Sequence, residues 1–443
     1  MATNGRPNSP TTWVRYSVLA GLCVATTIAY LDRGCLQTAV KPIRLELGLD
    51  KDQMGLVLSS FFLAYAVLQM PTAWLGHVWG TRWALPFFAI VWSAAIGLCG
   101  TAEGFATLLF WRFVMGAAEA GIFPCAMASL GRWFPDNRRA WVSGVLGSFM
   151  GVGGGLGTGL TALLLVHFTW RAVFVLYALP GLVWAVWFFL WFRDSPADHP
   201  AVNRAELFLI EGSHAQVTHQ DAAASPTPWA TILGSVTMWW LSLQQFFRAA
   251  GYIFFMSWFT TYLEETYGIS LERAGELAAL PHAGMLVGAL AGGMIADAIL
   301  VWTGSRRLSR QGLAIISLTI CGMLALFSGA IADPVLAVAV ITLGAFFSSL
   351  AGPVAYAMTI DLGGRHVAPV FGLMNMSGNV GAILFPAVAP RLVRWTGNWD
   401  VVLFVFAAMH VFAAGCWIFL DPNRAIFPDP ASRESKRPER IDN

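Results

Sequence analysis

The sequence predicts an all-α integral membrane protein, with twelve transmembrane helices in two six-helix, pseudo-symmetric bundles. Three observations predict this fold class: the low charge, the series of long apolar segments and an internal repeat. Hydrophobic residues make up 57% of the 443-residue chain and charged residues only 12%, and the mean hydropathy is +0.62. Soluble domains carry about 25% charged residues. The composition therefore indicates a polytopic membrane protein.

The apolar segments are long enough to cross a bilayer, which takes about 20 helical residues. Twelve candidate spans follow one another at 16–40, 55–77, 84–101, 104–126, 141–163, 171–192, 233–262, 274–297, 311–331, 335–358, 367–390 and 400–420. The longest polar insertion, 193–230, contains RDSPADHP and AAASPTPW. We expect it to be a cytoplasmic linker between two six-helix domains, 1–192 and 231–422. The tail, 423–443, is expected to be disordered.

The distribution of positive charge predicts the orientation, because Lys and Arg concentrate in cytoplasmic loops. If both termini are cytoplasmic, 17 of the 27 Lys and Arg residues fall in cytoplasmic segments and seven in outer loops. No small-residue cleavage site precedes the first apolar segment, so we expect it to remain as the first span. The prediction is a multi-pass protein of a bacterial inner membrane, with both termini inside.

The two halves of the chain resemble one another at matching places. RWFPDNRRAWVSGVLGSFMGVGGGLG follows the fourth span and DLGGRHVAPVFGLMNMSGNVGAILFP follows the tenth, and each is a basic loop before a Gly-rich span. TWRAVFVLYA at the sixth span matches NWDVVLFVFA at the twelfth. Two parallel halves, related by an axis along the membrane normal, are a known transporter layout that places the substrate near the midplane. The repeat therefore predicts a transporter.

Catalytic and metal-binding motifs do not stand out in the sequence. The six cysteines lie in apolar segments without a CxxC spacing, and we expect them to be small buried hydrophobic residues. The net charge of +2 gives no sign of nucleic-acid binding. We therefore expect no enzyme activity, no cofactor and no metal.

Five ionisable residues lie well inside the predicted spans: Asp32, Arg33, Arg112, Glu119 and Arg248. A charge at the bilayer centre costs about 2.5–3.5 kcal/mol on insertion scales, so such residues are usually functional. Their charges sum to a single positive charge, which an anion of charge −1 would neutralise. Protonation of one carboxyl group would leave room for a charge of −2. This arithmetic favours an anionic substrate coupled to protons.

Arg33 is the strongest candidate for binding the substrate, because a guanidinium group matches a carboxylate with two parallel hydrogen bonds. The alternative is a structural pair with Asp32, although neighbouring residues point about 100° apart on a helix. Arg112 and Glu119 lie seven residues apart, two turns along one helix face. Burial favours a neutral carboxyl group and nearby arginines favour an ionised one. Glu119 could therefore load a proton with the substrate, unless it forms a static pair with Arg112.

Polar residues in the later spans are candidates to contact the substrate from the second half. Arg248 lies about one turn from Gln244, Gln245 and Tyr252, and its alternative role is to snorkel toward the cytoplasmic surface. Asn375 and Asn379 share one face of the eleventh span. Their amides suit sugar hydroxyls, but amides also hydrogen-bond neighbouring helices together.

Nearly the whole chain resembles the major facilitator superfamily, and within it the anion:cation symporter family of sugar-acid and hexuronate transporters. The stretches that carry the resemblance are YLDRGCLQTAVKPIRLELGLDKDQMG, RFVMGAAEAGIFP, RWFPDNRRA, TWRAVF, RDSPADHPAVNRAE, SWFTTYLEETYGIS and GLMNMSGNVGAILFP. The resemblance assigns Asp32 and Glu119 to proton coupling and Arg112 to the control of Glu119. It also places Tyr65 in the cavity. Related organophosphate antiporters clamp phosphate with one arginine from each half, which Arg33 and Arg248 resemble.

Three places depart from the family pattern. The loop between spans 2 and 3 usually reads Gly-x-x-x-Asp-Arg-x-Gly, but WLGHVWGTR puts His77 and Val78 at the Asp and Arg positions. The second half retains Asp297 as its gate residue. We therefore expect a first-half inner latch that is weaker or pH-sensitive. Met150 and Tyr356 stand where relatives often have glutamine and tryptophan, which predicts a pocket adapted to a different substrate.

These features predict a monomeric transporter that imports a small organic anion with protons by alternating access. The best candidate is a sugar acid: a hexuronate, an aldonate or an aldarate. Two alternatives remain open. One is an organophosphate/phosphate antiporter, and the other is a transport-incompetent ligand sensor of the same fold.

Overall fold

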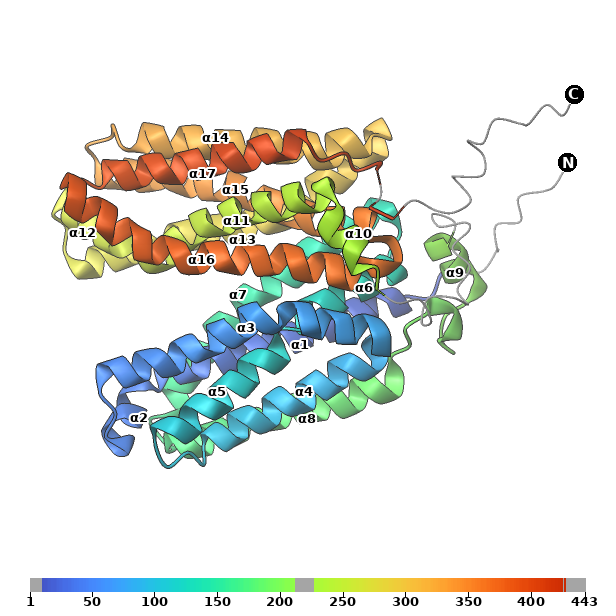
Figure 1. The fold of residues 1–443 in the computed structure, drawn as a ribbon, viewed down its shortest axis with the longest axis horizontal. Helices are drawn as coiled ribbons and strands as arrows, with labels where there is room; N and C mark the ends of the chain where they lie inside the picture. Colours follow the sequence, from blue (N-terminus) through green and yellow to red (C-terminus); the bar gives the residue numbers. More distant parts are fainter. Residues whose placement is uncertain (1–9, 212–226, 425, 428–443) are drawn as a thin grey trace, which may run out of the picture.

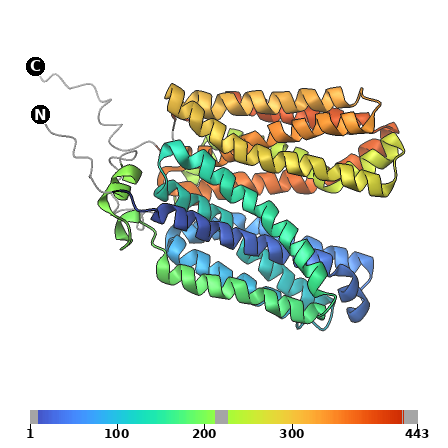
Figure 2. The ribbon, with the colours of Figure 1, turned by 180° about the vertical axis from the view of Figure 1, so that it is seen from behind.

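The computed structural model describes residues 10–211, 227–424, 426 and 427. Within these ranges the description leaves out the side chains of residues 51, 211, 252, 253, 255–257, 271, 272, 386 and 387. Figure 1 shows two bundles of long helices side by side, one built from the blue-to-green part of the chain and one from the yellow-to-red part. Figure 2 shows the same division from behind.

Twelve long segments cross the described molecule. In the first half they are α1 (Val14–Thr38), α3 (Lys51–Trp79), α4 (Thr81–Cys99), α5 (Phe105–Glu119) with α6 (Ile122–Trp133), α7 (Arg139–Leu164) and α8 (Trp170–Trp191). In the second half they are α11 (Val236–Ser257), α13 (Leu271–Thr303), α14 (Leu313–Ser328), α15 (Pro334–Gly363), α16 (Val367–Thr396) and α17 (Asp400–Ile418). Nine helical runs in the described residues are long and apolar enough to cross a membrane, and one of them, 334–396, contains both α15 and α16.

Short helices connect these segments. They are α2 (Val40–Leu47), α9 (Arg204–Glu211), α10 (Trp229–Gly234) and α12 (Phe259–Tyr267), with single turns η1 (Asp136–Arg138), η2 (Pro196–Asp198), η3 (Arg307–Gly312) and η4 (Gly364–His366). Helix α9 lies at the end of the molecule where α1 begins, whereas α2 and α12 lie at the opposite end (Figure 1). By the charge distribution, we call the α9 end the cytoplasmic end.

Two predicted spans are interrupted. The fourth, predicted at 104–126, consists of α5, which ends at Glu119, and α6, which begins at Ile122 and continues to Trp133. Pro124 lies in the first turn of α6, where its missing N–H costs no helical hydrogen bond. The seventh, predicted at 233–262, is α11 followed by a break at Trp258 and the start of α12.

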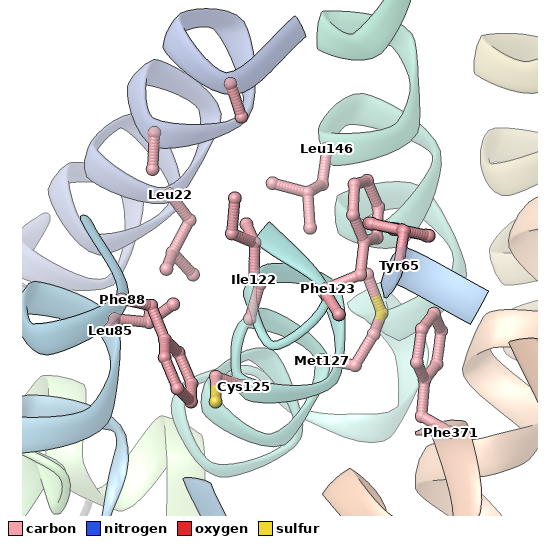
Figure 3. Close-up of a cluster of buried hydrophobic side chains, with 14 of the residues drawn as sticks. Leu22, Tyr65, Leu85, Phe88, Ile122, Phe123, Cys125, Met127, Leu146 and Phe371 are labelled. Atoms are coloured by element: carbon pink, nitrogen blue, oxygen red, sulfur yellow. The ribbon is translucent and has the colours of Figure 1, made fainter. Parts of the chain in front are cut away.

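The outside of the bundles is apolar, as a lipid-facing surface requires. Val183, Leu190 and Phe412 are each more than 60% exposed. A soluble protein would leave few such large apolar side chains in contact with water. Inside the first half, apolar side chains from several helices pack together, as Figure 3 shows around Ile122 and Phe123.

Glycines bring helix backbones into contact within each half. A Cβ atom on Gly157 of α7 would lie 2.5 Å from the Leu31 carbonyl oxygen of α1, and one on Gly153 would lie 2.5 Å from that of Thr27. A Cβ atom on Gly292 of α13 would likewise lie 2.5 Å from the Leu350 carbonyl of α15. Only glycine permits such close approach between membrane helices.

The first part of the linker is attached to the first half. Glu206 of α9 is fully buried and accepts hydrogen bonds from the Thr12 hydroxyl at 2.5 Å and from the Arg15 backbone N–H at 3.1 Å. The Arg15 guanidinium group donates to the same carboxylate at 3.1 Å. Residues 212–226 of the linker, and most of the predicted tail 423–443, lie outside the described residues, so the predicted domain limits remain predictions.

Candidate functional site

Arg33 lies near the outer end of α1, among aromatic rings. Its guanidinium carbon lies 4.2 Å from the ring centroid of Tyr30, 4.9 Å from that of Phe61 and 4.5 Å from that of Tyr65. Aromatic faces attract a guanidinium group and hold it flat. The structure therefore brings together Arg33 and Tyr65, which the sequence nominated from different spans.

The carboxylate paired with Arg33 is that of Glu119. Arg33 Nε donates to Glu119 Oε2 at 2.6 Å, and the side chains are 12% and 0% exposed. Glu119 is the last residue of α5, next to the break at Ala120 and Gly121. Its other oxygen, Oε1, has no hydrogen-bond partner among the described atoms. The considered alternative of a pair between Arg33 and Asp32 does not occur.

Asp32 and Arg112 are buried in the interior of the first half. Asp32 is fully buried, and neither of its carboxyl oxygens has a hydrogen-bond partner among the described atoms. Arg112 is 1% exposed, donates to the Met115 sulfur at 3.1 Å and places its guanidinium carbon 4.5 Å from the Phe61 ring centroid. Arg112 and Glu119 share no hydrogen bond in the described structure. The considered static Arg112–Glu119 pair is therefore absent from this state.

The candidates of α11 separate into two groups. Arg248 is half-buried and donates through Nε and Nη2 to the Gln245 side-chain oxygen at 3.2 and 3.0 Å. Gln244 is fully buried, and its amide donates to the Leu241 carbonyl within the same helix at 2.9 Å. Gln244 therefore faces the packed interior rather than Arg248. The Tyr252 side chain lies outside the described residues.

Tyr356 belongs to an aromatic contact between the two halves. Its ring centroid lies 5.3 Å from that of Phe371 on α16 and 6.4 Å from that of Phe123 on α6. The rings of Phe123 and Phe371 are stacked with centroids 6.3 Å apart, and Figure 3 shows Tyr65, Phe123 and Phe371 in one region. Asn375, one turn beyond Phe371, is half-buried and forms no hydrogen bond in the described structure. Met150 of α7 is also half-buried.

Asn379 contacts the first half through Gln69, which sequence reasoning missed. The Asn379 amide donates to Gln69 Oε1 at 2.8 Å, while Gln69 is fully buried and its own Nε2 has no partner among the described atoms. Gln69 lies one turn beyond Tyr65 on α3. A polar residue four positions from Tyr65 in an apolar span was the available signal. In this state, Asn379 holds the halves together.

Asp297, which the sequence predicted as the second-half gate residue, contacts the first half at the cytoplasmic end. It accepts the backbone N–H of Trp141 at 2.8 Å and that of Ala140 at 3.3 Å, at the beginning of α7. A helix N-terminus stabilises a carboxylate there. Arg310 donates to Asp297 at 3.4 Å. We call this set of contacts the Asp297 latch.

Asp361 of α15 extends this network, and sequence reasoning missed it. Its carboxylate pairs with Arg139 of the first half at 2.9 Å and with Arg310 at 3.1 Å, and its side chain is fully buried. Arg306 also pairs with Asp136 across the halves. These bonds close the cytoplasmic end of the molecule.

The corresponding first-half position, His77, contacts a second histidine. His77 Nε2 and His366 Nδ1 lie 3.1 Å apart, and the residues are 8% and 1% exposed. His77 is near the end of α3, and His366 ends η4 just before α16. Val78 is exposed.

The sequence pattern of the Major Facilitator Superfamily matches residues 22–332 and, in a second overlapping match, 243–440. The chain belongs to the Major Facilitator Superfamily. This membership, with the all-helical fold, confirms the predicted multi-pass membrane transporter with two six-helix halves. A transporter superfamily also agrees with the expectation that the chain is not an enzyme.

Curated relatives match almost the full length of the chain. The probable sulfoacetate transporter SauU of Cupriavidus necator is 29% identical over 408 residues, which cover 92% of this chain and 94% of that protein. The hexuronate transporter of Bacillus subtilis is 29% identical over 427 residues, 95% and 97% of the two chains. Among solved structures, the E. coli fucose:proton symporter FucP matches 92% of this chain and 99% of its own, with a TM-score of 0.68 and 15% identity. That likeness shows the fold alone.

Proposed function

We propose that this superfamily member imports a small organic anion together with protons. The observation that carries this proposal is the ion pair between Arg33 and Glu119 inside the aromatic cluster. A substrate carboxylate and the Glu119 carboxylate would compete for the same guanidinium group. Binding of the substrate carboxylate to Arg33 therefore affects the protonation state of Glu119.

The competition couples the substrate to a proton. Glu119 uses only the Nε edge of Arg33, and the two Nη groups of Arg33 are not paired with a carboxylate in the described part of the chain. When a substrate carboxylate takes over the guanidinium group, Glu119 is left buried without its partner. An unpaired buried carboxylate is costly, so Glu119 takes up a proton. Release of the substrate restores the ion pair and expels that proton.

Asp32 is the proposed second proton site. It is buried without a hydrogen-bond partner among the described atoms, and the charges of Glu119 and Arg112 act on it. Arg112 carries the nearby positive charge that would balance Asp32 once ionised. A shift of Arg33 or Glu119 therefore changes the electrostatic cost of charging Asp32, as coupled sites do.

The best candidate substrate is a sugar acid, namely a hexuronate, an aldonate or an aldarate. A carboxylate suits Arg33, and the half-buried amide of Asn375 and the Arg248–Gln245 pair supply polar groups for hydroxyls in the second half. The hexuronate transporter of B. subtilis, with 29% identity, supports this class. SauU, named as a sulfoacetate transporter, supports a smaller anion with two acidic groups as the nearest competitor.

We place the protein in a bacterial cytoplasmic membrane as a monomer, with both termini inside. Each net positive charge carried inward gains about 2.3 kcal/mol per 100 mV of membrane potential. That energy corresponds to a concentration ratio of about fifty. Such a ratio suits the uptake of a scarce carbon source.

A second candidate is an exchanger of organophosphate and phosphate. This candidate is supported by Arg248, which has no carboxylate partner in the described part of the chain. Arg248 therefore offers a second cation in addition to Arg33. Two arginines, one from each half, would match a phosphate group. This candidate requires internal phosphate and no proton gradient.

The deciding experiment is uptake into liposomes that contain the purified protein. We expect an inward proton gradient to drive the accumulation of one radiolabelled acid from a panel of hexuronates, aldonates, aldarates and sulfoacetate. The gradient should have no effect in liposomes without protein. Uptake that needs internal phosphate, and ignores the proton gradient, would replace the proposal with the exchanger.

A further inference from the structure

The contact between His77 and His366 joins the two halves at the cytoplasmic end. His77 belongs to the first half and His366 to the second, and their facing nitrogens lie 3.1 Å apart. The ring centroids are 4.8 Å apart and the rings are tilted by 54°. Both residues are buried. The distance is that of a hydrogen bond, so one ring donates an N–H and the other accepts it with a lone pair.

The groups around this pair carry positive charge. The charged groups that act on it in the described structure are Arg132 of α6 and Arg365 of η4. Arg132 is itself within 3.4 Å of Asp194, and the Phe427 ring covers His366 with a centroid distance of 4.6 Å. No carboxylate in the described residues pairs with either imidazole. The surroundings therefore offer no compensation for added positive charge.

The hydrogen bond requires that at least one ring be neutral. A first proton can be shared, because a protonated ring still donates to a neutral one. A second proton removes the accepting lone pair and leaves two cations in contact, next to two arginines. An imidazole released from this contact takes up a proton between about pH 5 and 8, which the buried pair disfavours. Acidification in this range therefore opposes the contact.

The Asp297 latch is built from different groups. Its carboxylate is held by backbone N–H groups of α7 and by Arg310. Those donors remain charged or polar at every physiological pH. The cytoplasmic closure thus has one contact built from a carboxylate and one from imidazoles.

We propose that the His77–His366 pair is a proton-sensitive gate contact, which acidification of the cytoplasm breaks. Breaking it destabilises the state that is closed on the cytoplasmic side. Proton-coupled import acidifies the cytoplasm, so the pair would slow the return of the carrier to its outward-facing state. The gate would in this way limit its own proton load. The proton sensitivity of the contact does not depend on the substrate, whereas this limit on the proton load rests on the proposed proton coupling.

The test measures the opening of the cytoplasmic end at two pH values. Spin labels at Trp83→Cys and Trp302→Cys, which are exposed positions on α4 and α13, report the distance between the halves. The six native cysteines are buried. The full-length protein would carry Glu119→Gln and Asp32→Asn, so that protons at the substrate site do not contribute. Pulsed electron paramagnetic resonance then gives the closed fraction at pH 7.5 and pH 5.

We expect acid to lower the ratio of closed to open molecules by up to about tenfold per pH unit for each proton taken up. His77→Asp should reverse the sign, because a carboxylate gains an ion pair when His366 is protonated. His77→Phe with His366→Phe should abolish the response. His167→Phe, which removes an exposed imidazole outside the contact, is the matched control and should respond as the parent does.

Two results would overturn the inference. One is an equal closed fraction at both pH values in the parent protein. The other is an acid response of the same sign and size in His77→Asp, because the responding group would then lie elsewhere. Asp297→Asn separates the two contacts: it should lower the closed fraction at both pH values and leave the acid response in place.

Discussion

The Arg33 guanidinium group donates to Glu119 at 2.6 Å while stacking against Tyr65. One cation is thus shared between a buried acid and a cluster of aromatic rings. The proposed substrate-binding role and the proposed proton-coupling role meet in this one residue pair. Substitution of either residue should therefore affect transport in a distinct way.

Arg33→Lys should reduce transport although it keeps the charge. An ammonium group cannot present the two parallel hydrogen bonds of guanidinium or stack flat on the aromatic rings. Loss of one charged hydrogen bond corresponds to about a 10- to 100-fold loss in kcat/KM. Initial uptake rates into liposomes measure it. Arg307→Lys, on the exposed cytoplasmic turn η3, is the control and should transport normally. If the Arg33→Lys variant transported at the parental rate, the proposal that Arg33 binds the substrate would be wrong.

Glu119→Gln should separate substrate movement from proton movement. The amide keeps the shape of the side chain but cannot release a proton or form the ion pair with Arg33. We expect exchange of labelled for unlabelled substrate to continue, while accumulation driven by a proton gradient stops. Both assays use the same preparation of the variant, so continued exchange shows that the protein is folded. Gradient-driven accumulation at the parental rate would assign proton coupling to another group.

Asn379→Ala should weaken the cytoplasmic closure. Gln69 would lose its bond and remain fully buried with no hydrogen-bond partner, at a cost of about 1–3 kcal/mol to the closed state. Spin-label distances across the cytoplasmic end, without substrate, measure the shift. Asn375→Ala removes an amide one turn away that forms no hydrogen bond in the described structure, so it should not change that distribution. Equal shifts in the two variants would contradict the gate role of Asn379.

Glu46 provides a pH-dependent contribution to stability outside the membrane. Hydrogen bonds from Arg171 at 2.8 Å and from Trp170 at 2.6 Å lower the pKa of Glu46. Because the folded pKa lies below the unfolded one, this stability is present above about pH 4.5 and is lost as pH falls through the folded pKa. Glu46→Gln should therefore lower Tm at pH 7 and have less effect at acidic pH.

The pair that Glu46 forms is half-exposed, so the effect on Tm should be small, about 1–3 °C. Thermal unfolding of the purified protein at several pH values measures it. Glu276, which pairs with Arg273 at an exposed position in a single helix, offers the matched variant Glu276→Gln. A larger loss of Tm for Glu46→Gln at pH 4 than at pH 7 would contradict the assigned cause.

The fold was predictable because a bilayer imposes long apolar helices and because the repeat is visible in the sequence. The helix breaks could not be predicted from the sequence. At the boundary between α5 and α6, for example, small residues continue through the break without a change in hydropathy. The charged residues were nominated individually, but their pairing was not. Arg33 of α1 meets Glu119 at the end of α5, although α1 packs mainly against α7 and α5 against α3. No sequence spacing encodes that contact. Gln69 and His366 were missed because each acts only through a partner in the other half.

The backbones of α1 and α7 are so close at Gly153 and Gly157 that the two helices must move together as one rigid unit. The main chain that carries Arg33 is therefore supported by α7, which contributes no charged side chain to the surroundings of Arg33. A larger residue at Gly153 or Gly157 would push α1 away from α7 and displace Arg33 from its aromatic surroundings. The contact between α1 and α7 therefore leaves little room for substitutions that would change the substrate preference. There is more room at half-buried positions such as Met150, Tyr356 and Asn375, where a side chain can change while the frame stays intact.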